Sequence, residues 1–475
     1  MPEPPAIDFG TSGLRGRAEG FTREAVFAHV GGFLETACAK ARGRAVLIGR
    51  DLRASSPAIA ALVGGAVEAL GWRAVNAGAV PTPALALAGL ERGVPAIMVT
   101  GSHIPPDYNG LKFYRPDGEL LKSDEAPIRA AAERLGTDIP PFTPGLPPAD
   151  PAVERDYRKR YVAALAPDTL KGLRVGVFEH SAVGRDGLSA VLTALGAECK
   201  PLGRSENFVA VDTEAVEPEA LARLRAALAA EKFDAVVSTD GDGDRPLLVD
   251  AAGQQVNGDI LGALTARWLG VKRIVTPLTS TGALDASGWF DTVSRTRIGS
   301  PYVVEAMGAA GAEPVVGFEA NGGFLVGSDI ALARGMLKRL PTRDALLPLI
   351  AVLAAARARG VPVADLAGEL PRRVMRADRL RDVAPDAGRA LVAELAVSEA
   401  LRAGFDPLLA RPRLIDTRDG TRLTTGEGIV VHFRQSGNAP ELRCYVETDG
   451  AEASEKILAT MMAKLAAQIA AQETR

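Results

Sequence analysis

Cysteine, histidine and aromatic residues are scarce in this sequence of 475 residues. The chain has four histidines, 5% aromatic residues and three cysteines, Cys38, Cys199 and Cys444. The cysteines lie far apart and form no Cys-x-x-Cys pair. The sequence therefore indicates neither a disulfide framework nor a cysteine zinc site.

Long apolar runs and an excess of charge are also missing. No stretch approaches the roughly 18 apolar residues that a membrane-spanning helix needs, because Arg and Glu interrupt the Ala- and Leu-rich segments. The net charge of -3 provides no general attraction to nucleic acid or to an anionic membrane. The segment Met1 to Phe9 lacks the basic start and apolar stretch of a secretory signal. We expect a cytoplasmic protein that binds neither nucleic acid nor membrane and captures an anionic small molecule with local cations.

The length predicts several domains. A chain of 475 residues is too long for one hydrophobic core and suggests about three or four domains. The clearest linker is Thr137–Pro151, which holds six prolines and has no apolar periodicity. Further boundaries are predicted near Ala251–Asn257 and near Leu370–Val374. The resulting domains are 1–150, 151–255, 256–373 and 374–475.

Most of the chain alternates between short apolar strands and amphipathic helices. Helical spacing is clearest in Pro57–Leu70 and Gly187–Leu195. The predicted strands are Ala45–Gly49, Trp72–Val75, Ala96–Thr100, Arg174–Phe178, Phe233–Ser238 and Arg273–Pro277. This alternation predicts α/β layers with parallel sheets.

The last section, Val374–Arg475, has a different pattern. It contains a charged helix, a predicted hairpin around Asp419–Gly420, the strand Gly428–Phe433 and a terminal helix. These features predict an α+β domain.

The segment Val99–Lys112 contains a candidate nucleophile. Ser102 follows the predicted strand Ala96–Thr100, and ligand sites of α/β sheets lie at the carboxyl ends of strands. His103 and Lys112 add a proton carrier and a fixed cation. Serine is a weak nucleophile without assistance, so a polar turn explains the local sequence equally well.

A second candidate site is the segment Ser238–Arg245. Asp240, Asp242 and Asp244 alternate with two glycines directly after an apolar strand. Carboxylates that converge repel one another unless a cation joins them, and hard oxygen ligands suit Mg²⁺. A magnesium site is favoured over a solvated acidic turn, and the spacing does not fit an EF-hand.

Three further segments carry weaker signals. In Gly317–Gly323, Glu319 and Asn321 offer hydrogen bonds to sugar hydroxyls. In Phe9–Gly16, Arg15 is positioned to reach a phosphate. Arg434–Arg443 combines a guanidinium, a hydroxyl, an amide and glycine-freed backbone donors, which together suit a phosphate; the candidate residues are Arg434, Ser436, Gly437 and Asn438. Each of the three is also explained as a polar turn.

The five segments together resemble the α-D-phosphohexomutase family, which includes phosphomannomutases and phosphoglucomutases. In chain order they resemble the family's opening, phosphoserine, magnesium, sugar-recognition and phosphate-binding segments: Phe9–Gly16, Gly101–Lys112, Asp240–Arg245, Glu319–Gly323 and Arg434–Asn438. The resemblance implies four domains around one cleft, three related α/β domains with mixed or parallel sheets and a C-terminal α+β domain. It also implies a monomer or dimer that acts on sugar phosphates.

The resemblance implies a mechanism as well. Phosphorylated Ser102, which also contributes to the magnesium site, donates its phosphoryl group to a hexose phosphate and forms a hexose 1,6-bisphosphate. Arg15, Lys112 and Arg245 add positive charge, and His103 or Lys112 relays a proton. The residues that bind the sugar and its second phosphate are Glu319, Asn321, Arg434, Ser436, Gly437 and Asn438.

The sequence departs from the family pattern near the sugar. Ile104 stands where Asn is common, Asn321 where Ser is usual and Gly323 where His is frequent, and Ser300 occupies a position that is His in some members. We expect mannose phosphate as the substrate, with glucose phosphate second and glucosamine phosphate less favoured. A magnesium-dependent sugar phosphatase and a catalytically silent sugar-phosphate sensor are the alternatives.

Overall fold

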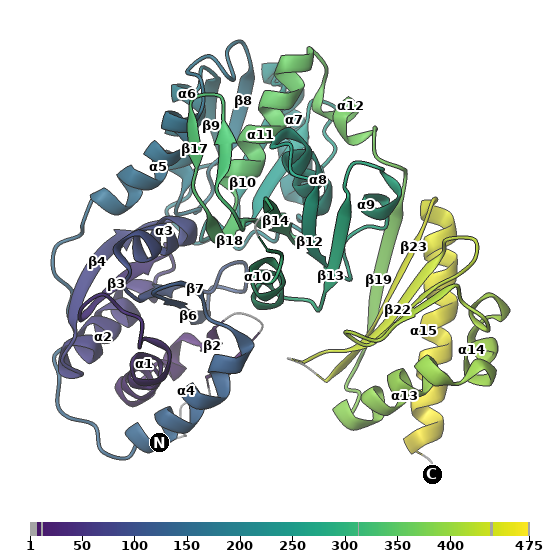
Figure 1. Ribbon diagram of the computed structural model, residues 1–475, viewed down its shortest axis with the longest axis horizontal. Helices are drawn as coiled ribbons and strands as arrows, with labels where there is room; N and C mark the ends of the chain where they lie inside the picture. The colour runs from purple at the N-terminus through teal and green to yellow at the C-terminus, as the bar shows by residue number, and fades with distance from the viewer. Residues whose placement is uncertain (1–6, 11–12, 312, 438–439, 474–475) are drawn as a thin grey trace. The chain divides into compact units, whose positions relative to one another are not determined.

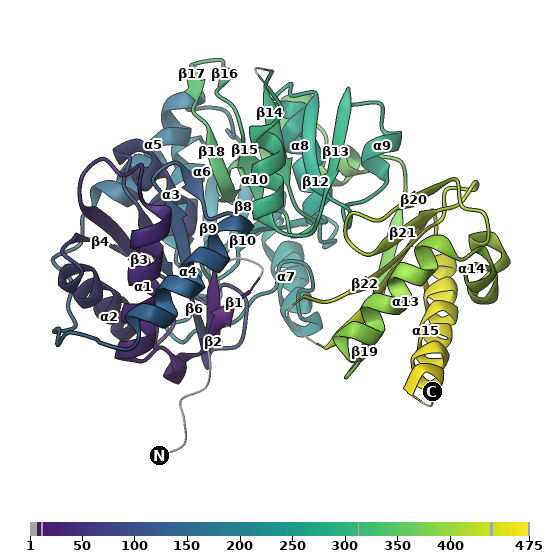
Figure 2. The same cartoon turned by 60° about the horizontal axis from the view of Figure 1, so that its bottom comes forward.

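The structure is a computed structural model that describes residues 7–10, 13–311, 313–437 and 440–473 (Figures 1 and 2). The chain forms two compact units. The N-terminal unit comprises residues up to 275 together with 299–369, and the C-terminal unit comprises 276–298 and 370 onward. The boundaries of the four predicted domains are finer than this division and stay a prediction. None of the described helices has the length and hydropathy that crossing a bilayer requires.

The first sheet has the strand order β1-β2-β6-β5-β3-β4, with β7 added beside β6. Strand β3 runs parallel to β4 and β5, whereas β6 runs antiparallel to β5 and β2. Helix α1 begins where the Thr22 hydroxyl accepts a hydrogen bond from Ala25 N, and α3 ends at Gly93 in the left-handed conformation. The elements are β1 (Asp8–Phe9), β2 (Leu14–Arg17), η1 (Ala18–Gly20), α1 (Arg23–Ala37), β3 (Ala45–Arg50), α2 (Ser56–Ala69), β4 (Arg73–Ala79), α3 (Thr82–Arg92), β5 (Ala96–Val99), β6 (Tyr108–Arg115), β7 (Gly118–Glu119) and α4 (Lys122–Leu135).

The predicted linker Thr137–Pro151 contains neither helix nor strand, as its prolines require. It packs on the first layer nonetheless. The Phe142 ring stacks on Phe27 of α1 with the ring centroids 5.9 Å apart, and Gly145 N donates a 2.9 Å hydrogen bond to Ala61 O in α2. The linker is therefore held in place against helices α1 and α2.

The second sheet has the order β11-β10-β8-β9, in which β8 is parallel to β9 and β10 while β11 is antiparallel. Strand β10 is buried along its whole length, and it begins with the apolar residues Ala235, Val236 and Val237. The elements are α5 (Ala152–Ala164), β8 (Arg174–Phe178), α6 (Arg185–Ala194), β9 (Glu198–Leu202), α7 (Pro218–Glu231), β10 (Ala235–Thr239) and β11 (Pro246–Asp250).

In the N-terminal unit a third sheet follows the order β12-β14-β15-β18. Strands β12 and β14 are parallel, and a turn with polar residues follows β14. Strand β15 runs antiparallel to both of its neighbours, β14 and β18. The elements are α8 (Gly258–Trp268), β12 (Arg273–Pro277), α10 (Ser300–Gly308), β14 (Val315–Phe318), β15 (Phe324–Val326), the hairpin β16 (Ile330–Leu332) and β17 (Gly335–Leu337), β18 (Leu340–Asp344), α11 (Leu346–Arg359) and α12 (Val363–Ala367).

The C-terminal unit is built on an antiparallel sheet of order β19-β23-β22-β21-β20. The hairpin predicted around Asp419–Gly420 joins β20 to β21. Helices α13 and α15 lie side by side and pack against the sheet (Figure 2). The elements are α9 (Ala283–Ala286), β13 (Thr292–Thr296), β19 (Val374–Arg381), α13 (Pro385–Val397), α14 (Glu399–Phe405), η2 (Pro407–Leu409), β20 (Leu414–Asp416), β21 (Thr421–Thr424), β22 (Val430–Gln435), β23 (Glu441–Thr448) and α15 (Ala451–Glu473).

Candidate active site

Ser102 lies in the turn that joins β5 to β6, at the carboxyl end of a buried strand. Its backbone φ of 53° is a left-handed conformation, which is unfavourable for a residue with a Cβ. The side chain is buried, and Oγ donates a hydrogen bond of 2.6 Å to Oδ2 of Asp240. The structure therefore brings together the serine turn and the aspartate turn that the sequence singled out.

The three aspartates converge in the turn between β10 and β11. One carboxylate oxygen from each of Asp240, Asp242 and Asp244 lies within 4.8 Å of the other two, and all three side chains are buried. The turn is closed by Asp240, whose Oδ1 accepts hydrogen bonds from Asp244 N at 3.1 Å and Arg245 N at 3.2 Å. Three carboxyl groups are thus held close together away from bulk water.

Two glycines allow this turn to form. Gly243 has a φ of 76°, which glycine adopts without steric cost. A Cβ on Gly241 would lie 2.9 Å from the carbonyl oxygen of Ser102. The close approach of the two turns therefore depends on the absence of a side chain at Gly241.

The donor set fits a divalent cation. Oδ1 of Asp242 and Oδ1 of Asp244 are buried and have no hydrogen-bond partner in the described part of the chain. Burial, together with the charges of Asp242 and Asp244, raises the pKa of Asp240 well above its usual range. A cation would bind the two oxygens that accept no hydrogen bond from the described residues and would remove the mutual repulsion, and an all-oxygen set suits a hard divalent ion.

Two cationic side chains donate hydrogen bonds to the aspartates. Lys112 Nζ donates hydrogen bonds of 2.6 Å to Oδ2 of both Asp242 and Asp244, and Arg343 Nε donates one of 3.0 Å to Asp244 Oδ2. Burial alone would raise the pKa of Asp244, but Arg343, Lys112 and Arg245 hold it below its usual range. Asp244 is therefore ionised in this surrounding.

His103 and Arg245 form a second contact beside Ser102. Arg245 Nη1 donates to His103 Nδ1 at 2.9 Å, and Ser102 Oγ lies 3.4 Å from the same nitrogen. Because the guanidinium can only donate, Nδ1 is an acceptor and the ring proton is on Nε2. Burial and the charges of Arg245 and Arg15 lower the pKa of His103 to about 3, so the ring is neutral.

Arg15 adds a further positive charge. Its strand β2 pairs with β6, which places Arg15 opposite Gly110. The guanidinium makes no hydrogen bond or ion pair with any residue that the structure describes. Burial and repulsion by Arg245 and Arg343 lower its pKa to about 10. An anion bound among these cations would relieve their repulsion. Thr11 and Ser12 of the same predicted segment lie outside the described residues.

The turn between β14 and β15 carries the predicted sugar-binding residues. Glu319 is buried, and its Oε2 accepts a hydrogen bond of 3.2 Å from Arg343 Nη1. Asn321 Oδ1 accepts from Gly323 N at 2.9 Å, and Asn321 O accepts from Thr213 at 3.1 Å. Asn321 therefore shapes the turn, while Oε1 of Glu319 accepts no hydrogen bond from the described residues.

Arg343 explains the glycine at position 323. A Cβ on Gly323 would lie 2.5 Å from Cδ of Arg343 and 2.7 Å from its Cγ. The aliphatic part of Arg343 fills this space, and its guanidinium joins Asp244 to Glu319. The aspartate turn and the turn between β14 and β15 are thus linked by one side chain.

Ser300 is buried at the start of α10, away from solvent. Its hydroxyl donates a 2.8 Å hydrogen bond to Oε2 of Glu119, whose Oε1 accepts a 2.5 Å bond from Thr342. Ser300 therefore holds α10 against β7 in this structure.

In the C-terminal unit, the predicted phosphate segment begins at the end of β22. Arg434 Nε donates a 2.8 Å hydrogen bond to Asp419 Oδ1. Ser436 is buried, and its N–H donates to the carbonyl of Glu441 at 2.8 Å. A Cβ on Gly437 would meet no atom within 4 Å. Asn438 lies outside the described residues.

Models of one protein family match nearly the whole chain. Phosphoglucomutase/phosphomannomutase alpha/beta/alpha domain I matches residues 6–137, domain II residues 156–253, domain III residues 257–374 and the C-terminal domain residues 373–464. The chain belongs to the phosphoglucomutase/phosphomannomutase family.

Individual members of this family align over almost their full length. A phosphomannomutase of Sinorhizobium fredii is 43% identical over 468 residues, which cover 96% of this chain and 98% of that protein. A phosphomannomutase of Salmonella muenchen is 39% identical over 474 residues, covering 98% and 96%. The crystal structure of a phosphoglucomutase/phosphomannomutase family protein from Burkholderia thailandensis has a TM-score of 0.77 at 22% identity and covers 96% of this chain and 97% of that one. The predicted fold class and the predicted phosphohexomutase class of enzyme are confirmed.

Sequence reasoning missed several residues that shape the site of this phosphohexomutase. Thr82 donates a 2.5 Å hydrogen bond to Asp242, Arg343 bridges the aspartate and sugar turns, and Arg53 contacts the serine turn. Asp419, which holds Arg434, also accepts from Ile298 N at 2.9 Å. None of them lies in a glycine-rich or alternating motif, and the contacts of Thr82, Arg343 and Arg53 join positions at least 49 residues apart in the sequence.

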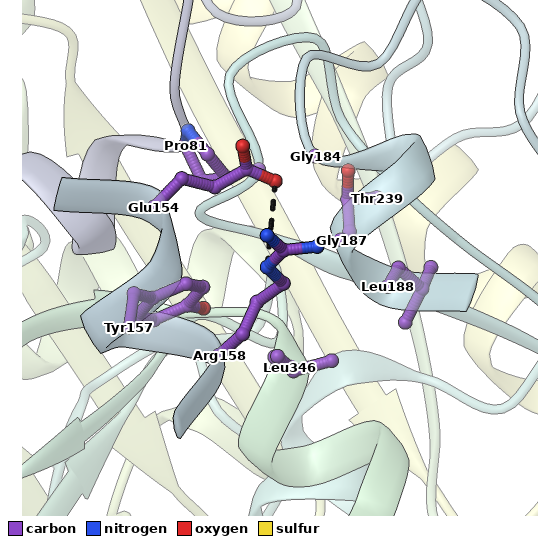
Figure 3. A pocket seen from close by; sticks show the side chains of 10 residues that line it. Pro81, Glu154, Tyr157, Arg158, Gly184, Gly187, Leu188, Thr239 and Leu346 are labelled. Carbon is purple, nitrogen blue, oxygen red and sulfur yellow. Dashed lines mark ion pairs between the residues drawn. The ribbon is translucent and has the colours of Figure 1, made fainter. Parts of the chain in front are cut away.

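A small cavity behind the aspartate turn is not a sugar site in this family member. Pro81, Thr239 and residues of α5 and α6 line it, and Glu154 and Arg158 form an ion pair at its wall (Figure 3). Its volume is about 20 Å³, which suits about one water molecule and no hexose phosphate.

Proposed function

We propose that this family member interconverts hexose 6-phosphate and hexose 1-phosphate through phosphorylated Ser102 and a hexose 1,6-bisphosphate, with mannose phosphate as its preferred substrate. The observation that carries the proposal is the buried 2.6 Å contact between Ser102 Oγ and Asp240, beside Asp242 and Asp244. A hydroxyl next to a cation site is the arrangement that phosphoryl transfer requires. The names of the two curated relatives support mannose as the sugar.

In the first half of the proposed reaction, phosphorylated Ser102 gives its phosphoryl group to a sugar hydroxyl. The bond between Oγ and phosphorus breaks, and a bond between the sugar oxygen and phosphorus forms. His103 or Lys112 relays the hydroxyl proton: the side chain gives its own N–H proton to Ser102 Oγ and takes up the hydroxyl proton in its place. In the second half, the other phosphate of the bisphosphate returns to Ser102 by the same exchange in reverse.

The charges of the site support this chemistry. A magnesium ion held by Asp240, Asp242, Asp244 and phosphorylated Ser102 would supply positive charge that offsets the charge of the transferring group. Arg15, Arg245 and Lys112 are proposed to bind the phosphoryl oxygens. Each is near the aspartate turn and adds positive charge at short range.

The other predicted site residues are proposed to bind the sugar and its second phosphate. Glu319 has a carboxylate oxygen available for sugar hydroxyls, and Asn321 holds the turn that presents it. Arg434, Ser436, Gly437 and Asn438 are proposed to bind the phosphate that does not react. The cytoplasmic location and the monomeric or dimeric state stay predictions from the sequence.

The proposed function is tested by product analysis. Mannose 6-phosphate is incubated with the protein, Mg²⁺ and a trace of glucose 1,6-bisphosphate, and both mannose 1-phosphate and free phosphate are measured. We expect isomerised sugar to exceed free phosphate by at least about 100-fold. The values of kcat/KM are then compared for mannose, glucose and glucosamine 1-phosphates, with mannose expected to be highest. Free phosphate as the main product would instead identify a phosphatase.

Replacing Arg434 by alanine should weaken binding of both isomers. We expect KM to rise about tenfold for mannose 1-phosphate and for mannose 6-phosphate, because each presents its non-reacting phosphate to the same guanidinium. Steady-state kinetics in both directions measure this. Arg411→Ala serves as the control, since Arg411 is exposed and pairs with Glu399 at 2.7 Å. A rise for one isomer alone would contradict a shared phosphate site.

A further inference from the structure

Arg53 is a buried arginine that no motif in the sequence singles out. It follows β3, and its side chain is among the largest that are fully buried. Its guanidinium donates hydrogen bonds to four carbonyl oxygens of the serine turn: those of Ser102 at 2.9 Å, Ile104 at 2.6 Å, Pro105 at 2.5 Å and Tyr108 at 3.0 Å. One side chain thus spans the turn from its nucleophile to the start of β6.

Asp51 fixes this guanidinium and also, through Thr100, the backbone N–H of Ser102. Oδ2 of Asp51 pairs with Arg53 Nε at 3.2 Å and accepts a 2.7 Å hydrogen bond from the Thr100 hydroxyl. The Thr100 hydroxyl oxygen in turn accepts from Ser102 N at 2.8 Å. The N–H and the C=O of Ser102 are therefore both held by the Asp51–Arg53 pair.

Water is excluded from the pair by close packing. The Phe208 ring lies 4.1 Å from the guanidinium carbon of Arg53, and a Cβ on Gly101 would lie 2.5 Å from that carbon. Hydrogen bonds strengthen in such a dry surrounding. The left-handed conformation of Ser102 is consequently held in place by its neighbours, as a strained residue requires.

We propose that Arg53 is a positioning residue for the phosphoryl-transfer step: it holds the turn of Ser102 so that Oγ faces the aspartate turn and the incoming sugar hydroxyl. The inference rests on the proposed function of Ser102. Lysine cannot replace the arginine, because a guanidinium presents five donors in a fixed plane and an ammonium presents three on a flexible stem. Misplacing a reacting atom by about 1 Å costs about 100-fold in rate.

The C-terminal unit supplies a matched control. Arg402 is also buried and also donates to carbonyl oxygens, those of Leu395, Ala396, Leu409 and Ala410. Arg402 and these four residues all belong to the segment 395–410 of the C-terminal unit. Arg402→Met therefore removes a similar set of hydrogen bonds without touching the serine turn.

The experiment compares the wild type with Arg53→Met, Arg53→Lys and Arg402→Met. Transfer of label from radiolabelled glucose 1,6-bisphosphate to Ser102 is followed in a single turnover, and Tm, kcat and KM are measured for each protein. We expect both Met variants to lose Tm. Only the two Arg53 variants should slow the transfer, by about 100-fold for Met and about tenfold for Lys, with KM changed less than about threefold.

Equal transfer rates in Arg53→Lys and Arg402→Met would overturn the inference, and this comparison holds even where Arg53→Met does not fold. A KM effect with normal transfer would overturn it as well. Wild-type protein that takes up no label on Ser102 would instead overturn the proposed function, and the inference with it.

Discussion

Replacing Ser102 by alanine is expected to reduce mutase turnover by at least about 1000-fold while leaving the fold intact. The side chain of Ser102 makes its hydrogen bond to Asp240, and its backbone bonds to Thr100 and Arg53 survive the substitution. The loss arises because no hydroxyl remains to carry the phosphoryl group. Isomerisation of mannose 1-phosphate and uptake of label from a bisphosphate both measure it.

Ser454→Ala is the matched control for this substitution. Ser454 is another fully buried serine, and its hydroxyl donates a 2.7 Å hydrogen bond to the carbonyl of Val374 in the C-terminal unit. Its removal should lower Tm while turnover per folded molecule stays within about twofold of the wild type. A Ser102→Ala protein that isomerises sugar phosphate at a near-normal rate would show that Ser102 carries no phosphoryl group.

The second large effect is expected from Asp242→Asn. We expect the Mg²⁺ concentration for half-maximal activity to rise about tenfold or more and kcat to fall about 100-fold. Asparagine keeps the shape of the side chain but removes its negative charge, and its single amide oxygen can still accept from both Thr82 and Lys112, which bond to the same oxygen of Asp242. A magnesium titration of activity measures the half-maximal Mg²⁺ concentration and kcat. Calorimetric titration with Mg²⁺ measures the affinity directly.

Asp250→Asn controls for loss of a buried carboxylate. Asp250 is buried at the end of β11, where its Oδ1 accepts a 2.9 Å hydrogen bond from Gln254 N. It lies outside the aspartate turn, so its substitution should leave the magnesium titration unchanged. An unaltered titration in Asp242→Asn would show that the aspartate turn does not hold the metal.

The sequence predicted the bounds of an element correctly where its residues repeat a local pattern. The apolar strands Arg174–Phe178 and Arg273–Pro277 have the predicted bounds, because an unbroken apolar run is typical of a buried parallel strand. The strand predicted as Trp72–Val75 instead extends as Arg73–Ala79. Its polar Asn76 and its Gly78 obscure the pattern, yet pairing with β3 carries the strand through them.

The candidate site was predictable where function requires a dense local motif. Ser102 and the three aspartates each follow a buried strand, so the edge of the sheets determines where they point. Arg53, Thr82 and Arg343 were not predictable, because each acts through a partner more than forty residues away in the sequence. A charged residue beside an apolar segment has the same local appearance whether it is solvated or buried with a distant carboxylate.

The packing of Arg343 against Gly323 has an evolutionary consequence. Any larger residue at position 323 would have to occupy the volume that the methylene groups of Arg343 now fill. Such a residue would therefore displace the guanidinium from Asp244 and Glu319. The two positions form a linked pair, so a larger residue at position 323 is expected only together with a smaller residue at position 343.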